Sequence, residues 1–242
     1  MSDVLILCYH AVSRSWPAAL AVTPEALERQ LGRLVARGYR GATFADALAA
    51  PTGRRVLAVT FDDAYRSVLE LAFPVLERFG LPGTVFVPTG FADTTTPMSW
   101  PGIEHWLGGP HEHELIPMSW EQLRRLHAAG WEIGSHSVSH PHLTRLGDAQ
   151  LEAELRGSRL ACAAGTGERC ASIAYPYGDV DGRVAAAARD AGYAFGAALP
   201  TSFHRPRPLE WPRVGIYHAD SERRFAVKVS PAVRLLRASL GR

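Results

Sequence analysis

The chain has 242 residues, of which 47% are hydrophobic and 21% are charged, a composition typical of a globular protein with one sizeable core. A formal net charge of +2, without a basic stripe, gives no reason to expect a nucleic-acid partner, and three cysteines are too few for a disulfide framework. No linker or repeat divides the sequence, so we expect a single domain over residues 1–242, with a core at about 4–217 and a helical tail at about 221–242.

The first predicted element is a buried strand over residues 4–9, and His10 stands where this strand stops. The apolar run is too short for a signal peptide or a membrane span, and no basic residue precedes it. We therefore expect a cytoplasmic protein without a transmembrane span. Thr23 and Pro24 are typical of a helix N-cap and first helical position, and the helical spacing of apolar residues continues to Gly38.

The next apolar run, Val56 to Phe61, is rich in β-branched residues and ends in two adjacent carboxylates, Asp62 and Asp63. Such a run predicts a parallel strand that is buried on both faces. Unpaired carboxylates beside a core are costly, so a cation is expected there, most simply a metal ion. The alternative is a solvated Asp-Asp loop that only caps the next helix.

Strands and helices alternate along the rest of the chain. The patterns predict helices over 68–79, 119–129, 151–160 and 181–192, and strands over 84–88, 131–134, 172–175, 193–198 and 213–217. Pro74 should kink or end the first of these helices. Residues 89 to about 117 show little periodicity, and loops of that length are usually lids or binding loops. The basic stretch 225–240 is open to two interpretations, a peripheral contact with anionic lipid or a solvated face.

This alternation predicts an α/β fold with a parallel sheet, although the periodicity does not distinguish a closed barrel from an open sheet. Polar groups follow four of the predicted strands, namely His10, the Asp62-Asp63 pair, the histidines at 136 and 140, and residues 175–177. In parallel α/β folds the carboxyl ends of the strands are where active sites form.

The polar groups suggest a hydrolytic metal site. His136 and His140 are four residues apart, which places two imidazoles on one helical face or in one tight loop. With one carboxylate of the Asp62-Asp63 pair they make the ligand set of a zinc site that activates water and polarises a carbonyl. The other carboxylate is then free to act as general base. His10 is the best-placed general acid for an amine leaving group, and main-chain N–H groups at 176–178 are candidates for holding an oxyanion.

These residues resemble the polysaccharide deacetylases, also called carbohydrate esterase family 4. The resemblance rests on Thr-Phe-Asp-Asp-Ala at 60–64, His-Ser-Val-Ser-His at 136–140 and Ala-Tyr-Pro-Tyr-Gly at 174–178, in the family's order. It implies a distorted (β/α) barrel and metal-dependent removal of acetyl from an N-acetylated carbohydrate, with Zn²⁺ as the expected cofactor. Residue by residue, it implies the following roles: Asp62 as the base, Asp63, His136 and His140 as metal ligands, and the main-chain N–H of Tyr177 as an oxyanion donor.

The sequence departs from the common family pattern at several places. Glycine usually follows the two aspartates, but Ala64 stands here, and Tyr175 replaces an arginine that orients the catalytic aspartate in many members. The C-terminal Asp-Trp and Leu-x-His motifs of many members are not evident. The Tyr9-His10 pair and the turn 175–178 match a bacterial variant whose acid histidine lies near the N-terminus, and Arg213 is a candidate to replace the missing arginine.

Several assignments have plainer alternatives. His10 is also consistent with a structural histidine at a strand end, and His142 is expected to be structural or to lie behind the ligands, because the metal already has three protein groups. The loop histidines 105, 111 and 113 fit a solvated loop better than a second metal site. The further candidates to bind or orient substrate are Tyr175, Pro176, Arg213 and Trp100. Trp100, like Trp106 and Trp120, either offers a flat face to a sugar ring or packs in the interior.

Three functions remain open at this point. The first is a metal-dependent hydrolase that removes an N-acetyl group from an amino sugar in a glycan, glycolipid or glycoconjugate. The second is a glycan O-acetyl esterase that uses the same site, which would depend less on a general acid. The third is a barrel that binds a glycan without turning it over. A pure binder has no need of an open metal position and a spare base, which favours an enzyme.

Overall fold

The computed structural model describes residues 3–49, 55–199 and 207–234. The barrel strands are β1 (Asp3–Tyr9), β4 (Arg40–Ala42), β5 (Arg55–Phe61), β6 (Gly83–Val87), β7 (Glu132–Ser135), β8 (Ser172–Ala174), β9 (Phe195–Ala198), β10 (Trp211–Pro212) and β11 (Val214–Gly215), and a separate pair is β2 (Ala11–Val12) with β3 (Ala21–Val22). The α-helices are α1 (Pro24–Ala36), α2 (Phe44–Ala49), α3 (Phe73–Arg78), α4 (Trp120–Ala128), α5 (Asp148–Thr166), α6 (Gly182–Asp190) and α7 (Glu222–Lys228). Shorter helical turns are η1 (Val68–Ala72), η2 (Glu104–Trp106), η3 (Glu112–Leu115), η4 (Leu143–Arg145) and η5 (Pro176–Gly178).

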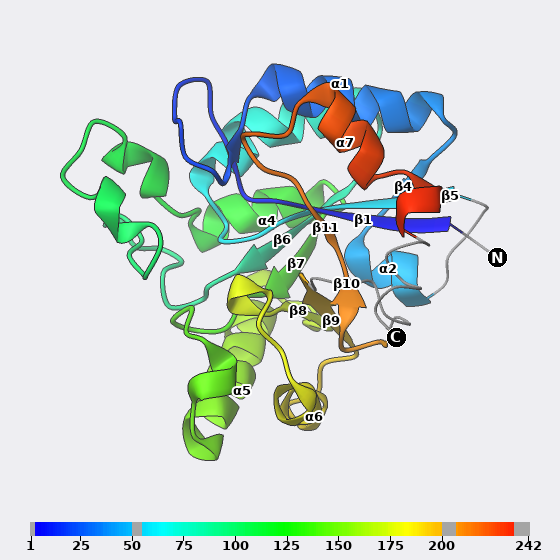
Figure 1. Ribbon diagram of the computed structural model, residues 1–242. Helices are drawn as coiled ribbons and strands as arrows, with labels where there is room; N and C mark the ends of the chain where they lie inside the picture. The colour runs from blue at the N-terminus through cyan, green and yellow to red at the C-terminus, as the bar shows by residue number, and fades with distance from the viewer. Residues whose placement is uncertain (1–2, 50–54, 200–206, 235–242) are drawn as a thin grey trace.

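The nine barrel strands form one parallel sheet in the order β10-β9-β8-β7-β6-β5-β1-β11, with β4 also paired to β5. The sheet curls into a nearly closed barrel, and helices lie around its outside (Figure 1). The loop with η2 and η3 and the segment with β2 and β3 extend at the carboxyl ends of the strands. The expected α/β fold and the distorted (β/α) barrel in a single domain are therefore confirmed.

The last two strands bring the edges of the sheet together. β10 pairs with β9 at one edge and β11 pairs with β1 at the other, although only Arg213 separates them in the chain. The backbone N–H of Arg213 donates to the carbonyl of Ala198 at 3.1 Å. A short segment thus spans the gap between the edges, and it carries Arg213 at the seam.

Side chains of β1 and β5 alternate between the two faces of the sheet, as the pleat requires. Ile6 and Ala58 belong to a small cluster that also contains residues of β6, β8 and β9, which places it inside the barrel. The register pairs Tyr9 with Phe61, so His10 and Asp62 follow at the same level. His10 follows the inward-facing Ile6 by an even number of residues, and Asp62 follows the inward-facing Ala58 in the same way. The alternation therefore directs the side chains of His10 and Asp62 toward the barrel interior.

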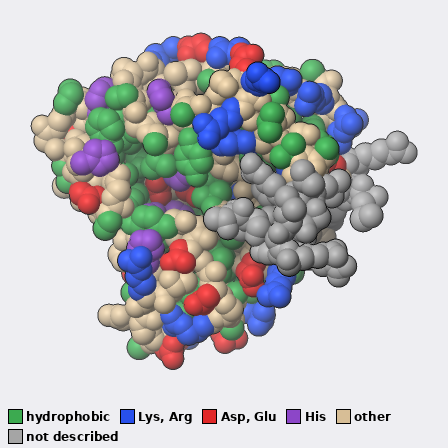
Figure 2. Space-filling view, viewed as in Figure 1, with side chains coloured by type: hydrophobic (Ala, Val, Ile, Leu, Met, Phe, Trp, Pro, Cys, Tyr) green, Lys and Arg blue, Asp and Glu red, His purple; other side chains and the backbone are tan. Residues whose placement is uncertain are grey.

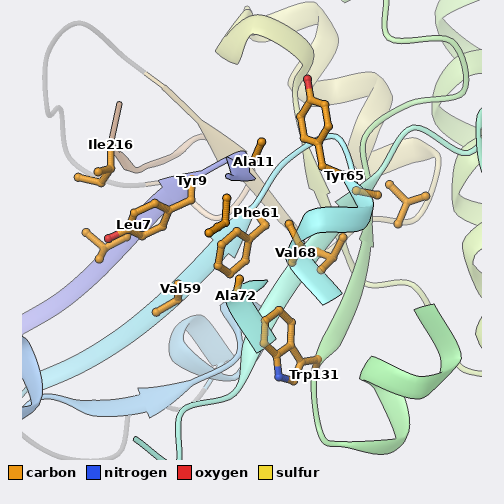
Figure 3. Close-up of a cluster of buried hydrophobic side chains, with 14 of the residues drawn as sticks. Leu7, Tyr9, Ala11, Val59, Phe61, Tyr65, Val68, Ala72, Trp131 and Ile216 are labelled. Atoms are coloured by element: carbon orange, nitrogen blue, oxygen red, sulfur yellow. The ribbon is translucent and has the colours of Figure 1, made fainter. Parts of the chain in front are cut away.

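The opposite face of the same strands packs under the outer helices (Figure 3). The ring of Phe61 stacks between those of Tyr9 and Trp131, with centroids 5.7 Å away on each side. The Tyr9 hydroxyl donates to Gln30 of α1 at 2.7 Å, which satisfies the one polar atom that the ring carries into this layer. This core holds the ends of β1 and β5, and therefore the site, in place.

Most of the predicted elements are confirmed, with some corrections. The Ser119-Gln122 capping box forms both of its hydrogen bonds at the start of α4, and the π-type turn η1 interrupts the predicted helix just before Pro74. Leu160 does not face the core, because it is 54% exposed while Cys162 of the same helix is buried. The last strand predicted over 213–217 is present but shorter, because β11 covers only Val214 and Gly215. The short strand β10, just before Arg213, was not predicted.

The predicted tail at 221–242 begins with α7, and residues 235–242 lie outside the described residues. Within the described part of the chain, no helix combines the length and the hydropathy needed to cross a bilayer.

Candidate active site

The predicted site residues come together at the carboxyl ends of β1, β5, β7 and β8. On the side viewed in Figure 2, the surface is hollowed, and acidic and histidine side chains are visible among apolar ones in the hollow. Asp62, Asp63 and His136 are each no more than 2% exposed, and His140 is 4% exposed. Groups that normally favour water are thus nearly excluded from it.

Asp63, His136 and His140 form a compact group of potential metal ligands. The Nε2 atoms of His136 and His140 both lie 3.3 Å from the same oxygen, Oδ1 of Asp63. The three side chains are buried, and their potential ligand atoms all lie within 4.8 Å of one another. The segment 136–140 is a tight loop rather than a helix, so of the two predicted arrangements for its histidines the loop is the one found.

The chemistry of this group fits a bound cation. Nδ1 of His136 is 2.8 Å from the carbonyl oxygen of Ala174, and since a carbonyl only accepts, we assign the proton to Nδ1. In the neutral ring, the lone pair of Nε2 then faces the Asp63 carboxylate, which is unfavourable unless a cation lies between them. Oδ1 of Asp63 has no hydrogen-bond partner among the described residues, as expected for an oxygen that binds a metal.

The Asp63 carboxyl is held in its charged form. Burial by itself would raise its pKa, but when His136 and His140 are protonated, as they can be without a metal, their hydrogen bonds and charge outweigh burial and hold the pKa well below its usual range. An ionised Asp63 is the form that coordinates a metal.

Asp62 makes a different set of contacts. Arg213 donates from Nη1 to Oδ1 at 2.6 Å and from Nη2 to Oδ2 at 2.7 Å, a bidentate pair between two buried groups. The guanidinium also lies 5.5 Å from the ring centre of Phe86 inside the barrel. Burial would raise the pKa of Asp62, but Arg213 outweighs it and lowers the pKa to about 2. Asp62 is therefore ionised at neutral pH and held in one orientation.

Cys8 of β1 and His10, which follows this strand, approach Asp62 from the inner face. Cys8, which is fully buried, donates through Sγ to Oδ2 of Asp62 at 3.4 Å. A ring nitrogen of His10 lies within 4.8 Å of both the Cys8 sulfur and an Asp62 oxygen. Burial lowers the pKa of His10, although the nearby carboxylates of Asp63 and Asp62 oppose this. The sequence reasoning missed Cys8, although its position two residues before His10, on the same side of the extended chain, was a usable signal.

Backbone strain is concentrated in these loops. Six non-glycine residues within the described ranges have positive φ, and five of them belong to the site loops, namely Asp63 (70°), Ala64 (54°), Ser137 (64°), His140 (61°) and Tyr177 (61°). Left-handed backbone costs about 1 kcal/mol or more for a residue with a side chain, and such strain is typical of functional sites. The φ value at Ala64 is one that glycine adopts without strain.

Aromatic rings enclose one side of the metal-ligand group. Trp100 stacks on His140 at a centroid distance of 4.1 Å, and Tyr177 contacts the same imidazole edge-on at 4.7 Å. Tyr177 also stacks on His142 at 3.9 Å and donates its hydroxyl to the carbonyl of Pro101 at 3.2 Å. Trp100 is 7% exposed, so most of its surface packs against protein, whereas Tyr177 is 38% exposed.

The remaining candidates do not join the group of potential metal ligands. Tyr175 is fully buried and its hydroxyl donates to the carbonyl of Leu209 at 2.8 Å, so its side chain packs in the core and offers no surface to substrate. Pro176 is buried at the start of the η5 turn. In the described ranges, the loop histidines 105, 111 and 113 belong to no group of three potential metal ligands.

Known proteins share both the sequence pattern and the fold. The family described as polysaccharide deacetylase matches residues 49–196, more than half of the chain. YxkH of Bacillus subtilis is 26% identical over 196 residues, which cover 79% of this chain and 62% of that protein. The poly-beta-1,6-N-acetyl-D-glucosamine N-deacetylase of Staphylococcus aureus strain MRSA252 is 23% identical over 172 residues, 66% of this chain and 54% of its own length. The chain thus spans only 54% to 62% of these curated relatives.

Solved structures support the fold. The Streptococcus pyogenes deacetylase PplD, in complex with acetate, superposes with a TM-score of 0.77 at 21% identity, over 95% of this chain and 99% of that one. IcaB from Ammonifex degensii superposes with a TM-score of 0.74 at 23% identity, over 95% and 97% of the two chains.

Proposed function

Because the chain belongs to the polysaccharide deacetylase family, we propose that it is a metal-dependent hydrolase that removes the N-acetyl group from an acetylated amino sugar in a glycan, glycolipid or glycoconjugate. One observation carries the metal dependence. Two imidazole nitrogens lie 3.3 Å from a single buried carboxylate oxygen, an arrangement that suits a cation shared by the three groups. Asp63, His136 and His140 would hold this cation, and Zn²⁺ suits the two-histidine, one-carboxylate set.

A divalent cation at this position would lower the pKa of water and polarise the acetyl carbonyl. Asp62, which Arg213 keeps ionised and oriented, accepts a proton from the attacking water. The main-chain N–H of Tyr177 donates to the oxygen on which negative charge develops. His10 gives a proton to the departing amine, and its lowered pKa makes its charged form a readier proton donor.

The similarity to the Staphylococcus aureus enzyme suggests a first substrate to test. Its name states that it deacetylates poly-beta-1,6-N-acetyl-D-glucosamine, and we propose glycans that contain N-acetylglucosamine as the starting point for this chain.

The test is acetate release from a panel of N-acetylated glycans and glycolipids. Three samples are compared, namely metal-stripped protein, the same protein after zinc is restored, and the zinc-loaded Asp62→Asn variant. Release that needs zinc and is lost in the variant supports the proposal. Full release by the stripped protein would refute the mechanism, and release from O-acetylated glycans alone would favour the esterase.

A further inference from the structure

The loop that carries both histidine ligands is held by a carboxylate from a neighbouring helix. Glu154 of α5 accepts hydrogen bonds through Oε2 from the main-chain N–H of Val138 at 2.7 Å and of Ser139 at 3.0 Å. Its other oxygen, Oε1, accepts from the Ser139 hydroxyl at 2.6 Å. No cationic side chain of residues 3–49, 55–199 or 207–234 lies within ion-pair distance of this carboxylate, so its partners are the three donors of the loop.

The loop needs such a support because its backbone is strained at both ends. Ser137 and His140 have φ values of 64° and 61°, so Val138 and Ser139 lie between two left-handed residues. Strained conformations of this kind persist only where surrounding contacts determine them. The two N–H groups bound by Glu154 belong to the two residues between the strained positions.

Other contacts fix the rest of the loop. Gly90 donates to the carbonyl of Val138 at 2.9 Å from the opposite side. The Ser135 hydroxyl accepts from the N–H of Ser137 at 3.2 Å and donates to the hydroxyl of Ser158 at 2.8 Å. Ser158 lies on α5, one turn after Glu154. Helix α5 therefore supports the loop through two side chains, Ser158 and Glu154, and Glu154 provides the charged contact.

From this geometry we propose that Glu154 is a positioning residue of the metal site. It acts through the loop 136–140, and it sets the distance and orientation at which the imidazoles of His136 and His140 meet Asp63. The inference rests on the proposed function, because it takes the three residues to be metal ligands.

The test measures zinc affinity by competition with a chromogenic chelator, on protein shown to be folded by circular dichroism. Glu154→Gln keeps the size of the side chain but removes the negative charge that strengthens all three hydrogen bonds. Its NH₂ group can only donate, so the contact with the Ser139 hydroxyl also has to reverse its direction. Loss of an outer support of a metal ligand typically weakens metal binding by about 10- to 100-fold, and we expect a loss in this range. Glu152→Gln is the matched control, since Glu152 lies on the same helix but forms an exposed ion pair with Arg156 at 3.5 Å.

A second variant keeps the test decisive if Glu154→Gln fails to fold. Ser139→Ala removes only the hydroxyl bond at Oε1, and we expect a smaller loss of zinc affinity, about 2- to 10-fold. A residue that only stabilised the fold would lower the unfolding temperature of the metal-free variant and leave its zinc affinity unchanged. Unchanged affinity in folded variants, with wild type binding zinc, would overturn the role of Glu154 alone. A wild-type protein that binds no zinc would overturn the proposed function as well.

Discussion

The buried pair between Arg213 and Asp62 gives the most direct test of the electrostatics. In Arg213→Met the apolar side chain fills much of the same volume but leaves Asp62 buried without its cation. The usual pKa of this carboxyl is 3.8 and Arg213 helps to lower it to about 2, a shift that corresponds to about 2.5 kcal/mol. Removal of one partner of a buried ion pair typically costs about 3–5 kcal/mol. We therefore expect the free energy of unfolding of the metal-free protein to fall by about 3–5 kcal/mol at pH 7.

The effect should depend on pH with a definite sign. The pKa of Asp62 is lower in the folded than in the unfolded state, so the pair contributes its full stability above the unfolded value of about 4. This contribution is lost as the pH falls toward about 2. The difference between wild type and Arg213→Met should thus be largest above pH 4 and shrink by about 2 kcal/mol as the pH falls to 2.

The assay is urea unfolding in the presence of a chelator, followed by circular dichroism from pH 7 down to the lowest pH at which both proteins stay folded. Arg213→Lys is the graded control, because lysine keeps the charge but cannot form the bidentate contact. Its free energy of unfolding should lie between those of wild type and Arg213→Met. The double variant with Asp62→Asn should recover part of the loss, since no uncompensated charge remains. A loss below about 1 kcal/mol, or one that is equal at pH 3 and pH 7, would refute this reasoning.

Three further predictions concern the acid, the metal and the barrel wall. His10→Gln should lower kcat for N-acetyl substrates by about 10²- to 10⁴-fold but affect an O-acetyl ester much less, because without a proton donor an alkoxide leaves more easily than an amine nitrogen that must depart as an anion. Equal effects on both substrates in an acetate-release assay would argue against His10 as the acid. His136→Ala should retain no zinc after dialysis while its circular dichroism stays native, and stoichiometric zinc in the dialysed variant would exclude His136 as a ligand. Gly83→Ala would place a Cβ 2.4 Å from the Trp131 ring and should lower the free energy of unfolding in urea by about 1–3 kcal/mol or more. The Cβ of Gly182→Ala meets nothing within 4 Å, so this control should be nearly neutral. Equal urea midpoints for the two variants would contradict this packing.

The parts of the site that lie close together in the chain were predictable from sequence. A buried strand ends in Asp62 and Asp63, and two histidines four residues apart follow another strand, so local spacing and strand ends were enough to group them. Parallel strands present their carboxyl ends at one edge, which is why residues from separate strands were expected to meet. The alternation within β1 would also have singled out Cys8, had it been applied to the inner face.

Contacts across the fold required the tertiary structure. Arg213 meets Asp62 from 151 residues away, because β10 and β11 pair with opposite edges of the sheet and leave Arg213 at the seam between them. No local pattern reports which edges a short segment will join. The same holds for Glu154, which looks like any polar residue of an amphipathic helix until α5 packs beside the loop 136–140. The sequence by itself determined which residues are candidates for the chemistry, because strand ends and motif spacing are local. Their orientation and charge state depend on distant groups that only packing brings together.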